Sequence, residues 1–174
     1  MLRLTQFIAH LKLRPLLQLI AIATTLSVGM PGFSGPFEDG LAARDRGDYA
    51  GAFGAFKSLA TAGDANSQFQ LSLLYSAGRG VNANPQEALR WLKQAAIRGQ
   101  VQAQSNLGNA FNAGRGVPQN LLKSYAWLSI AAATRDSVAI TNRDVVAKKL
   151  TPQQIEQANA LVRQCLAGNF MPCL

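Results

Sequence analysis

The sequence predicts an all-α protein, built as a short right-handed α-solenoid of stacked antiparallel helix pairs with C-terminal capping helices. Three observations predict this fold. A 36-residue unit occurs twice without a gap. Apolar residues recur at helical spacing within each unit, and a glycine-rich turn divides the unit into two halves. Neither helix of such a pair can bury its apolar stripe alone, so stacked units must share one continuous core.

The N-terminal segment is set apart by its composition. Residues 1–29 carry Arg3, Lys12 and Arg14 but no acid, and an apolar run from 16 to 28 follows the basic residues. This is the layout of a secretory signal peptide. A retained membrane anchor is the alternative, but the run is short for the roughly 20 residues that a span needs. We expect cleavage after Gly29, a linker at 30–36, and a periplasmic or secreted protein that meets a membrane only through this segment if it is uncleaved.

The repeat defines the units of the solenoid, which we predict over residues 37–135. Residues 75–81 recur as 111–117, and laying 64–99 over 100–135 gives identities at 12 of 36 positions. These identities include Gln68 with Gln104 and Trp91 with Trp127. We predict full units at 64–99 and 100–135. The same period indicates a half or divergent unit at 37–63, with a helix start near Asp48.

Each full unit is expected to contain two helices joined by the turn. Leu71 and Leu74 lie on one face of the first helix, and Ala88, Trp91 and Leu92 lie on one face of the second. Because the tryptophans recur with the structural period on an apolar face, we interpret them as core residues and not as ligand-stacking residues. The Gly-Arg-Gly between the helices allows positive φ angles where the first helix ends.

The succession of an aromatic residue, Gly-x-Gly-Val, a polar turn, Trp, Ala-Ala and a closing glycine resembles the Sel1-like repeat family, which is related to the tetratricopeptide repeats. The resemblance covers about residues 48–135 and implies a superhelical scaffold, of the kind used in signalling and protein quality control. Arg135 replaces the closing Gly99 of the preceding unit. We expect this replacement to weaken the outer boundary of the last unit.

The segment 136–174 is predicted to form capping helices and a tail. We expect a basic helix from Asn142 to Leu150. A second helix begins at a capping box, with Thr151 at the N-cap, Pro152 at the first position and a glutamine at the third. A pair of cysteines, Cys165 and Cys173, is expected to form a disulfide in an oxidising compartment.

The sequence predicts no catalytic residue, no metal site and no cofactor. His10 is the only histidine, and it lies in the predicted signal peptide. Apart from the adjacent Glu38 and Asp39, the acids are spread singly, and no Ser-x-x-Lys or Gly-x-Ser-x-Gly motif occurs. The sequence from Gly78 to Ala83 fits a dinucleotide-binding loop but follows a helix, so we interpret it as a repeat turn.

We therefore expect a protein that is not an enzyme. An envelope enzyme acting on peptidoglycan or a β-lactam is the alternative, since some cysteine-rich Sel1-like proteins have been linked to penicillin binding. Those relatives carry paired cysteines within each repeat, and this chain has none there.

The expected function is a non-catalytic scaffold or regulator that binds a protein or peptide of the bacterial cell envelope. The net charge of +8 becomes +5 without the three basic residues of segment 1–29. The remaining basic residues are scattered, so we expect no nucleic-acid partner. Amide side chains on the first helices can donate and accept hydrogen bonds, although a simply solvated face is the alternative. The candidate partner-binding residues are Asn66, Gln70, Leu73, Gln102, Asn106 and Asn109, with the turn residues Arg79 and Arg115.

Overall fold

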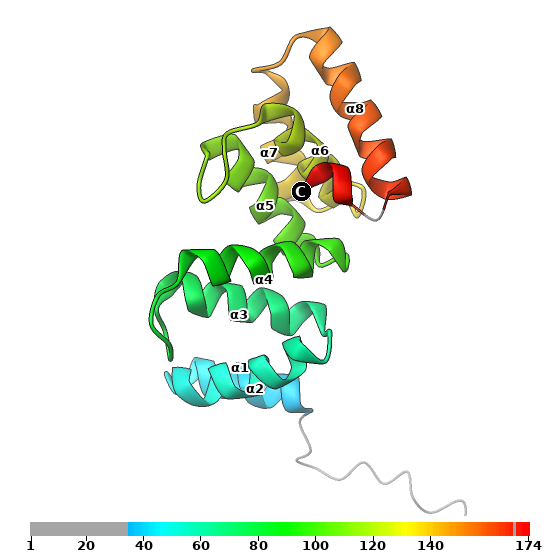
Figure 1. Ribbon diagram of the computed structural model, residues 1–174. Helices are drawn as coiled ribbons and strands as arrows, with labels where there is room; N and C mark the ends of the chain where they lie inside the picture. Colours follow the sequence, from blue (N-terminus) through cyan, green and yellow to red (C-terminus); the bar gives the residue numbers. More distant parts are fainter. Residues whose placement is uncertain (1–34, 169) are drawn as a thin grey trace, which may run out of the picture. The chain divides into compact units, whose positions relative to one another are not determined.

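A computed structural model describes residues 35–168 and 170–174, so the predicted signal peptide and nearly all of the predicted linker lie outside the described residues. The described part is all-helical, as the sequence predicts (Figure 1). It contains no helix that is long and apolar enough to cross a membrane. Its helices are, in order, α1 (Pro36–Asp45), α2 (Tyr49–Thr61), α3 (Ala65–Ala77), α4 (Pro85–Ile97), α5 (Val101–Ala113), α6 (Leu121–Ala132), α7 (Ser137–Ala147), α8 (Pro152–Ala167) and the short 3₁₀ helix η1 (Met171–Cys173).

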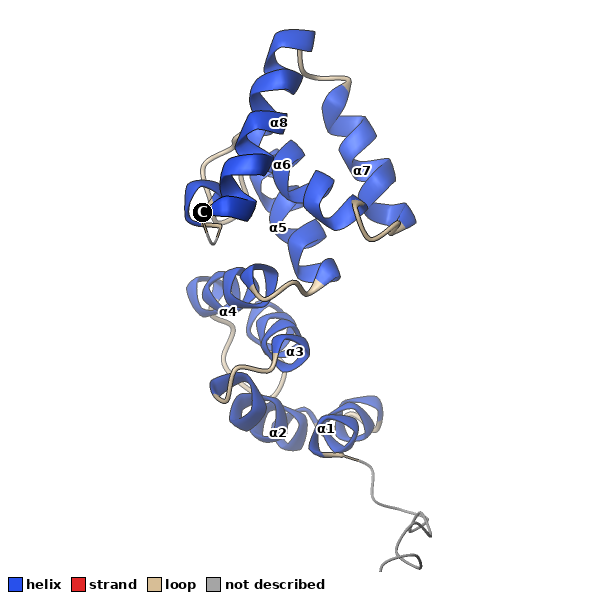
Figure 2. Ribbon diagram, turned by 90° about the vertical axis from the view of Figure 1, so that its right-hand side faces the viewer, coloured by secondary structure: helices blue, strands red, loops and turns tan. Residues whose placement is uncertain are grey.

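The helices pack as consecutive antiparallel pairs. Helix α1 contacts α2, α3 contacts α4 and α5 contacts α6, while α2 meets α3 and α4 meets α5 at the two junctions between pairs (Figure 2). Helices α7 and α8 both pack on α6 and cover the C-terminal side of the last pair. The predicted solenoid of helix pairs with C-terminal capping helices is therefore confirmed. Of the two alternatives for the first unit, half or divergent, residues 36–61 have the helices of a complete pair, α1 and α2.

Buried glutamines connect successive helix pairs. The side-chain amide of Gln68 donates a hydrogen bond to the carbonyl of Ala60 at 3.0 Å. At the next junction, Gln104 donates in the same way to the carbonyl of Ala96 at 3.1 Å. Each of these carbonyls lies in the last turn of its helix and also accepts a backbone hydrogen bond, from Gly63 and Gly99 respectively. This contact explains why the glutamine recurs with the 36-residue period.

Most helix starts carry a side-chain cap. The acids Asp48, Asp64 and Asp136 accept hydrogen bonds from backbone N–H groups in the first turns of α2, α3 and α7. The predicted capping box at Thr151 is present, with Gln154 as its third helical residue. Such caps satisfy N–H groups that have no partner within the helix.

The expected basic helix at 142–150 is wrong in its bounds. Helix α7 begins five residues earlier, at Ser137, because Asp136 caps it by accepting a hydrogen bond from the N–H of Ala139 at 2.7 Å. Ala139 is fully buried and packs in a cluster with alanines of α6. The helix ends at Ala147, and the chain then turns towards α8.

The boundary after the last repeat keeps its backbone conformation despite the loss of glycine. Arg135 has a φ of +65°, where the equivalent Gly63 and Gly99 have +99° and +85°. A non-glycine residue in this left-handed region carries conformational strain. Helix α7, which begins two residues after Arg135, packs on α6.

The C-terminal tail closes over the second repeat tryptophan. The indole N–H of Trp127 donates a hydrogen bond to the carbonyl of Cys173 at 3.0 Å, and its ring stacks on Phe170 at a centroid distance of 5.4 Å. The structure contains the disulfide between Cys165 and Cys173, and both cysteines are fully buried. Trp91 is also buried, so both tryptophans are core residues, as predicted.

Candidate functional site

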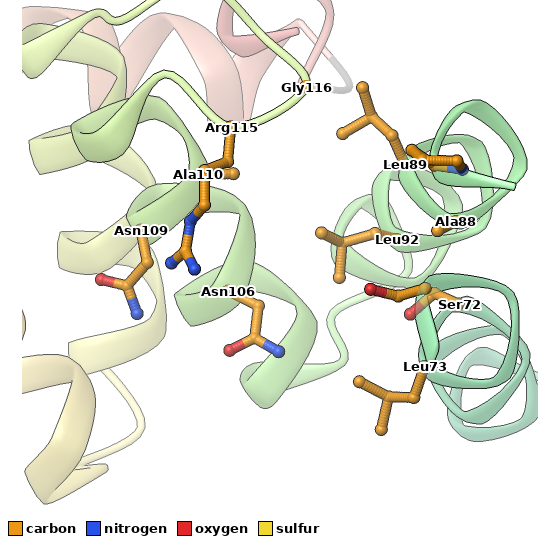
Figure 3. Close-up of a pocket in the computed structure, with 12 residues that line it drawn as sticks. Ser72, Leu73, Ala88, Leu89, Leu92, Asn106, Asn109, Ala110, Arg115 and Gly116 are labelled. Carbon is orange, nitrogen blue, oxygen red and sulfur yellow. The ribbon is translucent and has the colours of Figure 1, made fainter. Parts of the chain in front are cut away.

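A groove of about 450 Å³ lies at the junction between the second and third helix pairs. Its two walls differ in chemistry (Figure 3). Asn106 and Asn109 of α5 and Arg115 of the following turn form a polar wall. Leu73 of α3 and Leu89 and Leu92 of α4 face it as an apolar wall. The groove is lined by Ser72, Leu73, Ser76, Pro85, Ala88, Leu89, Leu92, Asn106, Asn109, Ala110, Arg115 and Gly116.

The structure places half of the sequence-predicted binding residues in this groove. They are Leu73, Asn106, Asn109 and Arg115. Leu73 keeps 41% of its surface exposed, so its side of the groove is open to solvent. An exposed leucine on the wall of a concave site is available to an apolar group of a partner.

The other four predicted residues lie outside the groove lining. Gln70 accepts a hydrogen bond from Arg44 at 3.0 Å, and Gln102 accepts one from Gln100. The guanidinium of Arg79 lies over the ring of Tyr49. The remaining residue is Asn66, which is exposed on α3.

The polar wall is free to bind a partner. Within the described part of the chain, the side chains of Asn106, Asn109 and Arg115 make no hydrogen bond and no ion pair. The two amides offer donors and acceptors, and the guanidinium offers only donors with a positive charge.

The turn that carries Arg115 is held in place from two directions. Gln119 donates a hydrogen bond to the backbone carbonyl of Asn112 at 2.7 Å. Lys149, which follows α7, donates to the side-chain oxygen of Asn112 at 2.9 Å. Gly114 ends α5 with a φ of +67°. These contacts fix the backbone from which the guanidinium extends.

A replacement at one repeat position explains why Arg115 is free and Arg79 is not. The two arginines are equivalent in the 36-residue period, and Tyr49 is equivalent to Pro85. The guanidinium carbon of Arg79 lies 5.0 Å from the ring centroid of Tyr49, in a cation–π contact. Pro85 offers no aromatic ring at the next junction, so Arg115 has no equivalent stacking partner.

Two further differences distinguish the junction between α4 and α5, which holds the groove, from the junction between α2 and α3. Phe53 packs edge-on against Tyr75, with 5.4 Å between ring centroids, where the next junction has the smaller Leu89 in place of the phenylalanine. In addition, the turn at Gly80 lies directly against the backbone of Tyr49, so a Cβ there would overlap its carbonyl. The equivalent Gly116 has only the tip of Leu89 nearby, 3.7 Å from a Cβ.

The two repeats that border the groove carry a positive net charge. Residues 64–135 contain seven Lys and Arg and two acids, Asp64 and Glu87, which gives a net charge of +5. Glu87 pairs with Arg90 at 2.8 Å. The hydrogen bond from Arg90 lowers the pKa of the Glu87 carboxyl, which is the opposite of the raised pKa that a general acid needs. Among the residues that the structure describes, no three His, Cys, Asp or Glu side chains group to hold a metal ion.

Sequence reasoning identified Leu73 of the apolar wall but missed the two leucines of α4. Leu92 was assigned only to the core-facing stripe of its helix, and Leu89 was not considered. The available signal was the position-by-position difference between repeats, where Tyr49 becomes Pro85 and Phe53 becomes Leu89. Both changes remove aromatic rings from the same junction.

Stacked helix pairs with a groove between two of them define an α-solenoid scaffold. Residues 65–100 and 101–133 each match the Sel1 repeat family model. Residues 65–133 of the chain are therefore two Sel1 repeats.

Solved structures agree with this assignment. The chain is similar to c5321, a protective antigen present in uropathogenic Escherichia coli strains displaying an SLR fold, with 27% identity over 79% of this chain and a TM-score of 0.71. It is also similar to a Sel1 repeat protein from Oxalobacter formigenes, with 30% identity over 59% of this chain and a TM-score of 0.55. The matches cover 30% and 42% of the lengths of those two chains. A comparison with curated proteins gives no match.

Proposed function

We propose that this protein is a non-catalytic scaffold or regulator of the bacterial cell envelope, and that it binds an extended peptide segment of a partner protein in the groove between its two repeats. The observation that carries this proposal is the facing pair of walls. Hydrogen-bonding side chains without internal partners lie on one side, and the exposed Leu73 with the half-buried Leu89 and Leu92 lies on the other. A peptide backbone matches the amides, and its apolar side chains match the leucines.

The size and position of the groove support a peptide ligand. Its volume of about 450 Å³ lies within the range of roughly 300–1,000 Å³ that is typical of ligand sites. It lies between repeats, so the rigid helices α4 and α5 hold the two walls in place. A site of this kind needs little reorganisation on binding, which favours affinity.

A location outside the cytoplasm rests on two supports. Buried disulfides persist in oxidising compartments, and Cys165 and Cys173 form one here. The similar protein from E. coli is described as a protective antigen. We propose a periplasmic or secreted protein whose partner is another envelope protein.

The function is tested by chemical crosslinking in the native cell, followed by affinity recovery and mass spectrometry. The double variant Asn106→Ala/Asn109→Ala should recover the crosslinked partner at least about tenfold less well than the unmodified chain, because it loses the amides of the polar wall. Gln157→Ala/Asn159→Ala on the exposed side of α8 is the matched control and should recover it fully. Equal recovery by both double variants would show that the groove is not the binding site.

A further inference from the structure

We propose that the groove selects an acidic peptide segment in which carboxylate and aliphatic side chains alternate, and that Arg115 is the residue that pairs with a carboxylate. This inference rests on the proposed function and names the chemistry of the partner. It is carried by the position of one free cation, by the leucines opposite it and by the charge of the two repeats.

The alternation follows from the geometry of an extended chain. Successive side chains of an extended peptide point to opposite sides. A peptide lying along the groove therefore directs every second side chain to the wall of Leu73, Leu89 and Leu92, and the others to the wall of Asn106, Asn109 and Arg115. Aliphatic residues fit the first wall, and groups that accept hydrogen bonds fit the second.

The charge selects carboxylates among those acceptors. A guanidinium binds a carboxylate through two parallel hydrogen bonds, which are stronger than bonds to a neutral acceptor. The groove lining contains no Asp or Glu that could neutralise Arg115. The net charge of +5 over the two repeats, residues 64–135, favours a segment with several acidic side chains over a single terminal carboxylate.

The two terminal segments of this chain are poor candidates for the ligand of the groove. The N-terminal segment 1–29 carries three basic residues and no acid, so it does not complement Arg115. The C-terminal residue Leu174 accepts a hydrogen bond from Lys123 at 2.8 Å, which ties that end of the chain to α6.

The first test measures binding of short fluorescein-labelled peptides to the full chain by fluorescence anisotropy. The peptides alternate Glu with Leu, Lys with Leu, Gln with Leu, or Glu with Ser. We expect the Glu-Leu peptide to bind at least about tenfold more tightly than each of the others. Its affinity should fall when salt is raised, because screening weakens the charge contribution. Equal or tighter binding of the Lys-Leu or Gln-Leu peptide would overturn the inference.

Matched variants then assign the carboxylate contact to one residue. Arg115→Gln should weaken binding of the Glu-Leu peptide about tenfold and reduce its preference over the Gln-Leu peptide. Arg79→Gln, at the equivalent position outside the groove, should change neither. An unchanged affinity for Arg115→Gln would overturn the assignment.

A second variant introduces at this junction the kind of cation–π contact that Arg79 makes with Tyr49. Pro85→Tyr places a ring where Tyr49 lies in the preceding pair, so we expect Arg115 to stack on it and the peptide affinity to fall. Gln86→Ala, at the neighbouring exposed position outside the groove lining, is the control and should retain binding. Tight binding by Pro85→Tyr would contradict the inference.

The outcomes separate the inference from the proposed function. If the peptides bind without preference for acids while the Asn106→Ala/Asn109→Ala variant loses its cellular partner, the groove binds a partner of other chemistry. If that double variant keeps its partner, the proposed function fails whichever peptide binds.

Discussion

The side-chain amide of Gln104 donates a hydrogen bond to the backbone carbonyl of Ala96, which joins the second and third helix pairs across the junction that forms the groove. Gln104 is almost completely buried, and the Ala96 carbonyl also accepts a hydrogen bond from the backbone N–H of Gly99 at 3.1 Å. Removal of the amide therefore costs one buried hydrogen bond, so we expect Gln104→Ala to lower the free energy of unfolding by about 0.5–1.5 kcal/mol.

Urea unfolding followed by circular dichroism measures this loss. Gln157→Ala, at an exposed position of α8, serves as the control and should change the stability by less than about 0.5 kcal/mol. Equal stabilities of the two variants would mean that the connection between helix pairs contributes nothing.

The disulfide is expected to hold the tail over Trp127. Its two cysteines are eight residues apart, and closing so short a loop stabilises a fold by about 2.5 kcal/mol. The variant Cys165→Ala/Cys173→Ala should lower the unfolding free energy by about that amount and shift Trp127 emission to longer wavelength. The Trp91→Phe background isolates the Trp127 signal. An unshifted emission spectrum would show that the hydrogen bond to Cys173 and the Phe170 stack hold the tail without the disulfide.

The two repeat turns should respond differently to the same substitution. Gly80→Ala and Gly116→Ala both place a side chain at positive φ, with angles of +71° and +72°, which costs about 1 kcal/mol. Gly80 alone also lies against the backbone of Tyr49. We therefore expect Gly80→Ala to lower the thermal midpoint at least about twice as much as Gly116→Ala. Similar midpoints for the two variants would mean that the first junction is as open as the second.

Replacement of Arg135 by glycine is expected to stabilise the fold. Arg135 adopts a φ of +65° in the turn after α6, where the earlier units have glycine. Arg135→Gly should raise the unfolding free energy by about 1 kcal/mol, because it removes left-handed strain. Gly99→Ala should lower it by a similar amount, since nothing lies within 4 Å of a Cβ at Gly99 and only strain is added. Unfolding curves that shift in the same direction for both variants would contradict this account.

The repeat made most of the fold predictable. A period of 36 residues with Trp91 and Trp127 in equivalent positions shows the helix pairs, because every unit must bury the same apolar faces. The start of α7 was not predictable from that period. It depends on the Asp136 cap and on burial of Ala139 against α6, which is a tertiary contact.

The candidate site was predictable only in part. The amides of Asn106 and Asn109 were identified because they lie opposite the apolar face of their helix. The groove itself depends on what one junction lacks, namely the ring of Tyr49 over its arginine and the ring of Phe53 beside Tyr75. A search for shared features between repeats does not detect such a loss.

The groove between the two repeats is the proposed binding surface. The most direct measurement is an NMR titration of the full chain with the Glu-Leu peptide, observing side-chain amides and leucine methyl groups. We predict that the largest shifts fall on Asn106, Asn109, Leu89 and Leu92. Largest shifts on another exposed apolar surface, such as Val138 and Val145 of α7, with the groove resonances unchanged, would contradict the account.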